Sequence, residues 1–242
     1  MKSMTVLGPG TNTCRALVLA SSLALLFGLG LLAPAVEAWD TSPSCGSSTF
    51  PATGQKISYE AMTPTHPTGT PVNDDGAVQA GGALSYQDNG DGTITDLNTG
   101  LMWEKKSQDG SDHDVTKTFP WSDPLLATIW DWIDAINTEV GNGIGFAGYN
   151  DWRIPNAKEL QSIVDYGRFN LAVDPAFNNN LAPGCTVLDC SATASSTFYW
   201  SATTFAANSG HAWGVFLGNG SVFTFNKGGP FFVRAVRGGC VP

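Results

Sequence analysis

The sequence predicts an α+β fold with two helices and a twisted antiparallel sheet joined by long loops. Apolar residues recur at helical spacing between residues 122 and 166, and apolar and polar residues alternate from residue 198 to residue 236. Glycine-containing turns separate these runs. Because the helical segments precede a group of strands and do not alternate with them, the pattern indicates the α+β class.

Residues 1–38 have the features of a signal peptide. Lys2 and Arg15 precede an apolar run over residues 16–32, and small residues near its end favour cleavage before Trp39. The run is close to the length of a membrane span, so an uncleaved anchor is the alternative. We expect cleavage, which leaves no membrane span. The protein would then be exported, that is, secreted or held at the cell surface or in the periplasm.

The exported chain is acidic, which limits its partners. Removing Lys2, Arg15 and Glu37 from the 12 basic and 21 acidic residues leaves 10 and 20. An acidic protein repels nucleic acid and other polyanions. We therefore expect no nucleic acid and a surface glycan or a protein as the ligand, with a homo-oligomer as a further option.

Residues 39–82 form a segment rich in threonine, proline and glycine. Such a segment buries little apolar surface and is expected to be extended. This arm or linker acts either as a spacer that lifts the domain off a surface or as a partly ordered N-terminal strand with loops. The folded domain then covers residues 83–242.

Four cysteines remain after cleavage. An even number in an exported chain implies disulfides, and three pairings are possible. We favour Cys185 with Cys190, which closes a short loop, and Cys45 with Cys240, which ties the two ends of the mature chain together. No CxxC pair and no nearby histidine supports a metal site at these cysteines.

The ordered part begins near Tyr86. Residues 87–96 contain Asn-Gly and Asp-Gly pairs, which predict a tight hairpin. The same run resembles half of a calcium loop through Asp88, Asn89 and Asp91, although later positions lack the expected carboxylates. Calcium is the only cofactor that the sequence suggests.

The first helix is predicted over residues 122–140. Apolar residues recur at helical spacing, Ser122 can cap the helix, and the following glycine can end it. Trp130 and Trp132 could form a ligand platform, but aromatic residues at this spacing are usually core residues, and we interpret them so.

The second helix is predicted to begin at Asn156. Its side chain and that of Glu159 fit a capping box, and the preceding proline keeps the chain extended. We expect the helix to continue to about residue 166. Before it, Asp151 and Arg153 flank Trp152, which suggests an ion pair at a buried junction.

Residues 169–196 show no clear periodicity and are expected to form a long loop region held by the Cys185–Cys190 disulfide. The alternating pattern that follows predicts strands over residues 198–205, 212–217, 222–226 and 231–236.

No motif of nucleophilic, zinc-dependent, phosphate-binding or dinucleotide-binding enzymes is found in the sequence. The three histidines are scattered. The acid–histidine group over residues 112–114 is interpreted as an exposed loop. We therefore expect a protein that is not an enzyme.

With no catalytic motif found, binding of a sugar is the function that the side chains of the strand region suit, because aromatic rings can stack on a sugar and amide or charged groups can hydrogen-bond to it. We expect Trp200 and Trp213 to be core residues and Arg234 to pair with a buried acid. The candidate ligand-binding residues lie in or near turns of the strand region: Asn219, Asn226, Lys227 and His211.

Five ordered motifs resemble those of the Lcl C-terminal domain family, a bacterial family named after a collagen-like adhesin. They are the stretches at residues 88–93, 99–103, 148–160, 199–203 and 233–239. The resemblance covers residues 86–239 and implies an exported or surface domain similar in fold to C-type lectins, with chain ends that meet in the sheet. A Cys45–Cys240 disulfide agrees with this arrangement.

The family assigns no catalytic residues. For the adhesin it implies binding of sulfated polysaccharides, but this chain is acidic and has no Gly-x-y repeat, which argues against a polyanionic ligand. The resemblance and the residues together predict an exported, non-enzymatic recognition or adhesion domain that binds carbohydrate. The alternatives are a structural subunit of an extracellular or cell-surface assembly and an enzyme related to formylglycine-generating proteins.

Overall fold

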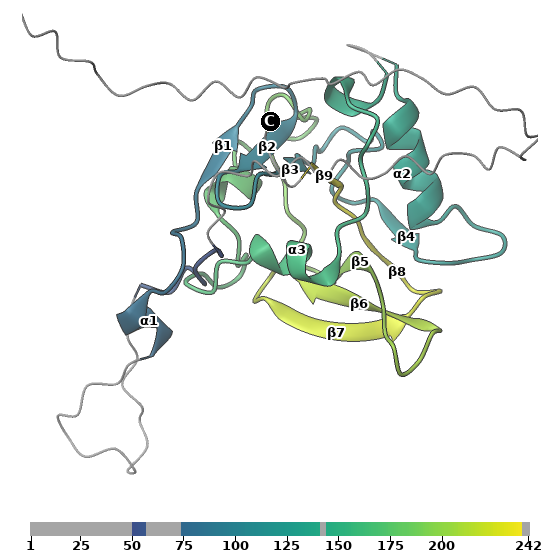
Figure 1. Cartoon of the computed structure of the whole chain (residues 1–242). Helices are drawn as coiled ribbons and strands as arrows, with labels where there is room; N and C mark the ends of the chain where they lie inside the picture. Colours follow the sequence, from purple (N-terminus) through teal and green to yellow (C-terminus); the bar gives the residue numbers. More distant parts are fainter. Residues whose placement is uncertain (1–49, 57–73, 141–143, 239–242) are drawn as a thin grey trace, which may run out of the picture. The chain divides into compact units, whose positions relative to one another are not determined.

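The computed structural model describes residues 50–56, 74–140 and 144–238, which all lie in the compact unit Pro43–Pro242. The predicted signal peptide and the predicted pair of Cys45 with Cys240 lie outside the described residues. Within the described ranges, no helix is long and apolar enough to cross a membrane. In chain order (Figure 1), the elements are α1 (Asp75–Val78), β1 (Tyr86–Asp88), β2 (Thr93–Asp96), β3 (Leu101–Glu104), β4 (Thr118–Pro120), α2 (Ile129–Thr138), η1 (Phe146–Gly148), α3 (Ala157–Ser162), η2 (Pro175–Phe177), β5 (Tyr199–Thr204), β6 (His211–Phe216), β7 (Ser221–Asn226), β8 (Pro230–Phe232) and β9 (Val236–Gly238).

The strands form two sheets instead of the single antiparallel sheet that the sequence predicts. One sheet has the order β1-β2-β3-β9 and is antiparallel, and the other has the order β4-β8-β5-β6-β7 and contains one parallel pair, β5 with β8. The predicted strand over 231–236 is divided between them, because the chain passes through the core at Arg234, which is 1% exposed. The α+β class is confirmed, and the single sheet is corrected to two.

Two pieces of the predicted arm are ordered. Pro51 forms a β-bridge with Gly82, and the N–H of Tyr166 donates to the carbonyl of Thr53 at 2.7 Å. The short helix α1, which the sequence did not predict, follows at Asp75–Val78. These contacts hold residues 51–53 against the segment after α3.

Helix α2 is shorter than the helix predicted over residues 122–140. It begins after Thr128, which forms a capping box with Asp131. Upstream, the carboxylate of Asp123 accepts from the N–H groups of Leu125 and the next residue and forms a turn. Leu125 is therefore exposed instead of facing the core. Local capping has overridden the apolar spacing in this segment.

The capping box predicted for the second helix is present. Asn156 Oδ1 accepts from the N–H of Glu159 at 2.9 Å, and Glu159 Oε2 accepts from the N–H of Asn156 at 2.8 Å. Helix α3 ends at Ser162, before the predicted end near residue 166, because the next residues form an antiparallel bridge to a later segment.

The predicted ion pair between Asp151 and Arg153 is wrong. Arg153 makes two hydrogen bonds of 2.7 Å to Glu159, and Asp151 accepts from Arg237 at 2.6 and 3.2 Å. The backbone of Arg153 bridges to β9, and this pairing places Arg237 next to Asp151. Trp152 is buried between them, as predicted.

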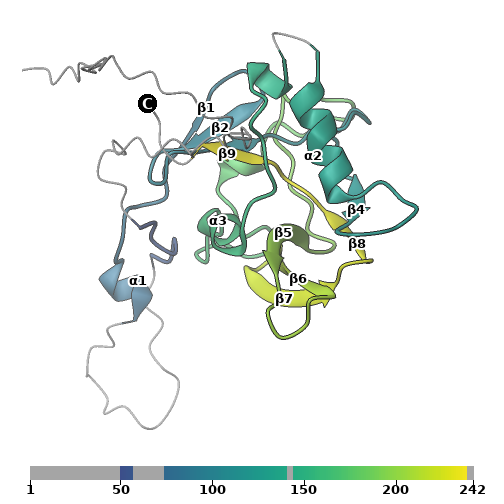
Figure 2. The same ribbon diagram turned by 45° about the vertical axis from the view of Figure 1, so that its right-hand side comes forward.

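Two apolar clusters form the core on the two faces of β5. Tyr199 belongs to the cluster with α3 and the four-stranded sheet, and Trp200 belongs to the cluster with α2, because successive strand residues point to opposite faces. Figures 1 and 2 show α3 over β5 and β6, and α2 beside β4. Trp132 of α2 is buried, as predicted, but Trp130 is 38% exposed.

Candidate functional site

Three of the four predicted ligand-binding residues lie together. His211 and Asn226 are opposite each other at one end of the β6–β7 hairpin, and Lys227 follows directly. Asn219 lies in the turn at the other end, where its Oδ1 accepts from the N–H of Ser221 at 2.9 Å. The structure therefore separates Asn219 from the other three.

Lys227 holds this end of the sheet to the segment after β4. Its carbonyl accepts from the N–H groups of Trp121 and Ser122 at 2.8 and 3.1 Å. Its Nζ donates to Thr204 Oγ1 at 2.9 Å and lies 3.6 Å from the centroid of the Trp121 ring, which is a cation–π contact. The ammonium group is thus fixed between a hydroxyl and an indole on a partly exposed side chain.

A second indole completes this surface. The rings of Trp121 and Trp130 are 4.9 Å apart at 89°, and Trp121 Nε1 donates to the carbonyl of Ser201 at 3.1 Å. The first ring is fixed by that hydrogen bond, and the second is open to solvent. We call this surface the Trp–Lys shelf; its residues are Trp121, Trp130, Asn226 and Lys227.

The polar groups of the shelf suit a neutral ligand with hydroxyl groups. Asn226 is exposed, and its Oδ1 accepts from the N–H of Gly228 at 2.9 Å. Within the described residues its amide nitrogen has no hydrogen-bond partner, so this nitrogen can donate to a ligand. An exposed indole beside amide and ammonium donors can stack on one face of a ring and bind its polar edge.

The three predicted calcium ligands each bond to a neighbouring residue. Asp88 pairs with Lys105 at 2.8 Å, Asp91 accepts from the N–H and hydroxyl of Thr93, and Asn89 donates to Thr93 Oγ1. Partial burial would raise the pKa of Asp88, but the hydrogen bond and charge of Lys105 hold it below its usual range. Across the described part of the chain, no three His, Cys, Asp or Glu side chains are placed to hold a metal ion.

A buried polar site that the sequence analysis missed lies against α2. Glu104 is fully buried, and its Oε1 accepts from Lys106 Nζ at 2.9 Å. Its Oε2 accepts from the N–H of Ala235 at 2.8 Å. Lys106 Nζ also lies 4.8 Å from the ring centroid of Trp132. Burial would raise the pKa of Glu104, but the charges of Lys106 and His113 hold it below its usual range.

The interpretation of residues 112–114 as an exposed loop is wrong for His113 and Asp114, which are both buried. His113 is 5% exposed, and its Nδ1 and Nε2 lie 2.8 Å from Glu104 Oε1 and 3.0 Å from Glu139 Oε1. Burial lowers the pKa of His113, but the hydrogen bonds to the two carboxylates raise it from 6.5 to about 9. His113 is therefore protonated at neutral pH, and both ring nitrogens are occupied.

Arg234 does not bind the carboxylate partner that the sequence predicts. Its guanidinium donates to the carbonyls of Glu104 and Ala192 at 2.8 and 2.6 Å, and to Thr193 Oγ1 at 3.1 Å. The carboxylate of Glu104 already accepts from other groups, so carbonyls and a hydroxyl solvate Arg234 instead. We call this group the buried charge cluster; its members are Glu104, Lys106, His113 and Arg234.

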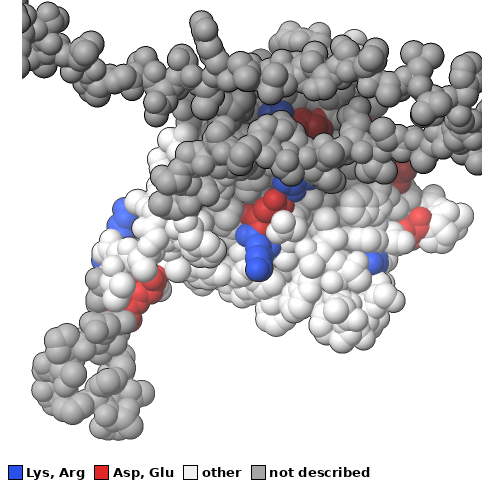
Figure 3. All heavy atoms as spheres, viewed as in Figure 1, with Lys and Arg blue, Asp and Glu red and all other residues white. Residues whose placement is uncertain are grey.

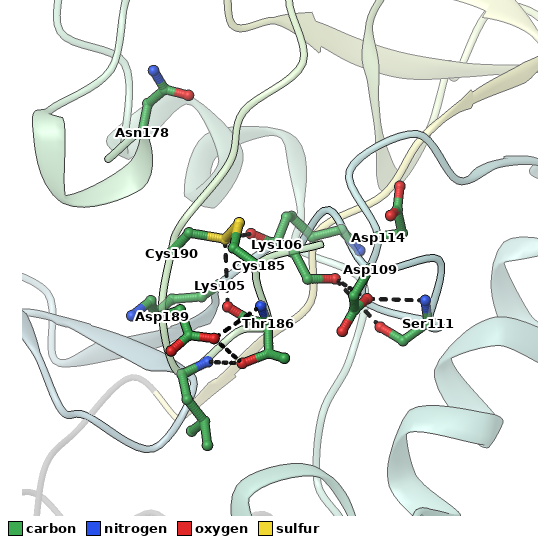
Figure 4. The surroundings of a disulfide bond; sticks show 12 residues. Lys105, Lys106, Asp109, Ser111, Asp114, Asn178, Cys185, Thr186, Asp189 and Cys190 are labelled. Carbon is green, nitrogen blue, oxygen red and sulfur yellow. Dashed lines mark hydrogen bonds between the residues drawn. A yellow bond between two sulfur atoms is a disulfide. The ribbon is translucent and has the colours of Figure 1, made fainter. Parts of the chain in front are cut away.

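The predicted Cys185–Cys190 disulfide is present. Figure 4 shows it between residues 105–106 and the turn over residues 186–189. The N–H of Ala192 donates to the carbonyl of Lys106 at 2.8 Å, and the N–H of Gln108 donates to the carbonyl of Cys185 at 2.9 Å. The disulfide loop is thus attached to the segment that carries the buried charge cluster.

Of the two tryptophans in the strand region that were predicted to be core residues, one is buried and the other is not. Trp200 is buried, as predicted. Trp213, which was also predicted to be a core residue, is only half-buried and packs its ring 5.5 Å from that of Phe205.

The sequence contains a signal for the buried charge cluster that the analysis missed. Charged residues make up only 14% of the chain, and Glu104 stands beside two lysines at the end of an apolar run. The Trp–Lys shelf has no such signal, because three distant segments build it.

The comparisons with known proteins agree with the sequence motifs. The family model of the Lcl C-terminal domain matches residues 92–237, which is more than half of the 242 residues. A search of curated proteins finds no match. The matched range contains the disulfide, the buried charge cluster and the Trp–Lys shelf. The chain therefore belongs to the Lcl C-terminal domain family.

Proposed function

We propose that the protein is an exported, non-enzymatic recognition domain that binds a neutral carbohydrate on the Trp–Lys shelf. One observation carries this proposal: the 38% exposed Trp130 stands at 89° to Trp121, which holds the ammonium of Lys227 against its ring. A sugar presents an apolar C–H face and a rim of hydroxyl groups. The face can stack on the exposed indole, and the rim can accept from the shelf's donors.

The charge near the shelf favours a neutral sugar over a sulfated one. Asp123 and Asp131 lie on the segments that carry the two indoles, and the chain has a net charge of −9. Lys227 is the only lysine or arginine among residues 198–232. A sulfated ligand would therefore meet more repulsion than attraction.

A C-type lectin-like scaffold is part of the proposal. The first and last strands of the domain, β1 and β9, belong to the same sheet, which supports an arrangement with meeting chain ends. The long segment between η2 and β5 is fastened by the Cys185–Cys190 disulfide, which supports a rigid scaffold with irregular connections.

Two observations support the export and non-enzymatic parts of the proposal. A disulfide persists in oxidising compartments outside the cytoplasm. His113, the histidine of the one dense acid–histidine group, is buried with both ring nitrogens bonded to carboxylates, so it serves folding and not proton transfer to a substrate.

A glycan array with the mature chain, beginning at Trp39, tests this function. We expect binding to at least one class of neutral glycan. Trp130→Ala and Lys227→Ala should each raise the dissociation constant by about tenfold, because a stacked ring or a fixed hydrogen bond contributes about 1–1.5 kcal/mol. Calorimetric titration with the best glycan measures this change.

The matched control is Phe169→Ala, which removes an aromatic side chain that is 85% exposed and lies outside the shelf. This variant should bind as the parent does. An array without signal would contradict glycan binding, and an equal loss in the Phe169 variant would contradict the location of the site.

A further inference from the structure

The edges of the two sheets differ in how they are protected. Edge strands expose unpaired N–H and C=O groups, and proteins usually keep them short or place charges or proline on them. The edge strands here are β1 and β9 in one sheet and β4 and β7 in the other. β1, β4 and β9 have three residues each and carry Asp88, Pro120 and Arg237. These three edges are therefore protected against pairing.

Strand β7 has none of these protections. It has six residues, Ser221–Asn226, without a charge or a proline. Its valine, threonine and two phenylalanines are residues that favour strands. In the described part of the chain, β6 pairs with one side of β7 and no strand pairs with the other side. An edge of this length and composition is suited to pairing with another strand.

The sheet face beside this edge is aromatic. Phe223 in β7 is 56% exposed, and its ring centroid lies 5.9 Å from that of Phe198. Gly214 of β6 lies beside this group: a Cβ built on it would lie 3.4 Å from Cβ of Phe198 and 3.4 Å from the ring of Phe225. We call this surface the phenylalanine face; its members are Phe198, Phe216, Phe223, Phe225 and Phe231.

The same surface is free of carboxylates. No Asp or Glu follows Asp189 in the sequence, so strands β5 to β9 contain none. Figure 3 shows the surface over β6 and β7 as largely white. Because the chain has a net charge of −9, two copies repel each other through their acidic surfaces but not through this one. This distribution of charge favours a second copy of the chain as the partner.

We propose that the protein forms a homodimer in which β7 pairs antiparallel with β7 of a second copy about a twofold axis. The pairing would extend the five-stranded sheet of each copy into the other and satisfy the unpaired backbone groups. With the axis perpendicular to the sheet, the phenylalanine faces lie on the same side and adjoin at the seam. Phe223 then packs against the second copy and loses its exposure to water.

Sedimentation analysis of the mature chain tests this proposal. We expect twice the monomer mass at micromolar concentrations. Phe223→Lys should raise the dimer dissociation constant by about a hundredfold or more, because it places two like charges at the seam. Leu125→Lys is the matched control, since Leu125 is an apolar residue that is 91% exposed and lies outside β7. This control should stay dimeric.

Hydrogen exchange distinguishes strand pairing from looser stacking of the phenylalanine faces. Amides of residues 221–226 should exchange more slowly in the parent dimer than in the monomeric Phe223→Lys variant, while both proteins unfold at the same denaturant midpoint when compared as monomers. The dissociation constant should not rise with added salt, because no ion pair holds the interface.

Several results would overturn the proposal. They are a parent protein that stays monomeric at the highest soluble concentration, a dimer that survives Phe223→Lys, a dimer that Leu125→Lys also disrupts, or β7 amides that exchange equally in dimer and monomer. A monomeric parent that binds an uncharged extended peptide along β7 would instead assign this edge to a peptide partner. Asn226 ends β7 and also belongs to the Trp–Lys shelf, but separate variants test the two proposals: Phe223→Lys tests the dimer and Trp130→Ala tests the glycan site.

Discussion

The segment around β3 buries charged side chains, whereas the five-stranded sheet exposes an aromatic one. Around β3, Glu104, Lys106 and Arg234 are at most 1% exposed, whereas in the five-stranded sheet Phe223 is 56% exposed. Each buried charge has partners from distant segments, so the cluster stabilises one arrangement of the chain. Phe223 contacts Phe198 but stays more than half exposed, which suits association with another surface.

The largest effect should come from removing the acid at the centre of the buried charge cluster. Glu104→Gln leaves Lys106 and His113 without their shared carboxylate, and loss of one partner from a buried ion pair costs about 3–5 kcal/mol. Denaturant unfolding followed by fluorescence measures the loss of stability.

Glu139→Gln is the matched control, because it acts on the same histidine from a carboxylate that is 36% exposed, compared with 0% for Glu104. Its expected cost is about 1 kcal/mol or less. Equal losses of unfolding free energy in the two variants would show that burial of the carboxylate does not determine how much it contributes to stability.

The pH dependence of stability should reveal the same cluster. The pKa of His113 is raised from 6.5 to about 9, so its contribution is complete below pH 6.5 and is lost as the pH rises through about 9. The expected fall in the free energy of unfolding is about 3 kcal/mol across this window.

Unfolding of the parent and of His113→Gln at a series of pH values between 6 and 10 tests this expectation. The variant should lose most of the slope in this window, because glutamine does not titrate. A parent protein with flat stability across the window would contradict a charged His113.

Removing the disulfide should have an intermediate effect on the charged region. A disulfide with a sequence separation of 5 closes a short loop, and its loss from Cys185→Ser with Cys190→Ser is expected to cost about 2 kcal/mol. Hydrogen exchange should then increase at residues 105–108, which bond to this loop, and not in the β6–β7 hairpin. Equal increases in both regions would contradict a local role.

The smallest effect on folding should come from the phenylalanine face. Phe223→Ser removes a ring that is more than half exposed, so the free energy of unfolding of the monomer should change by about 0.5 kcal/mol or less. Trp200→Ala, in the same sheet but fully buried, should cost about 3–5 kcal/mol. Thermal unfolding at low protein concentration compares the stability of the two variants. A large loss of stability in the Phe223 variant would show that the exposed ring contributes to the fold as a buried one does.

Local features were predicted well, and features that combine distant segments were not. Asn156 and Glu159 cap α3 as expected, because their three-residue spacing is sufficient to bring the groups together. Ser122 fails as a cap, because Thr128 with Asp131 offers the same geometry closer to the buried part of α2. Asp151 and Arg153 fail as a pair, because Arg237 and Glu159 approach from other elements.

The candidate site shows the same division. Asn226 and Lys227 follow from the turn pattern of the β-strand region, but Trp121 and Trp130 reach them from the segment after β4 and from α2. No spacing in the sequence connects these segments. The contact depends on the hydrogen bonds that tie residues 121–122 to the carbonyl of Lys227.

The sequence by itself determined the acidic balance, the α+β class, the family, the Asn156 cap and the Cys185–Cys190 bond, because composition, periodicity and close spacing are sufficient for each. Only the tertiary structure decided that Glu104 and His113 are buried together and that β7 is an unprotected edge. Those outcomes depend on which distant segments meet, and the free energy of such contacts is set by burial and partners that local sequence does not encode.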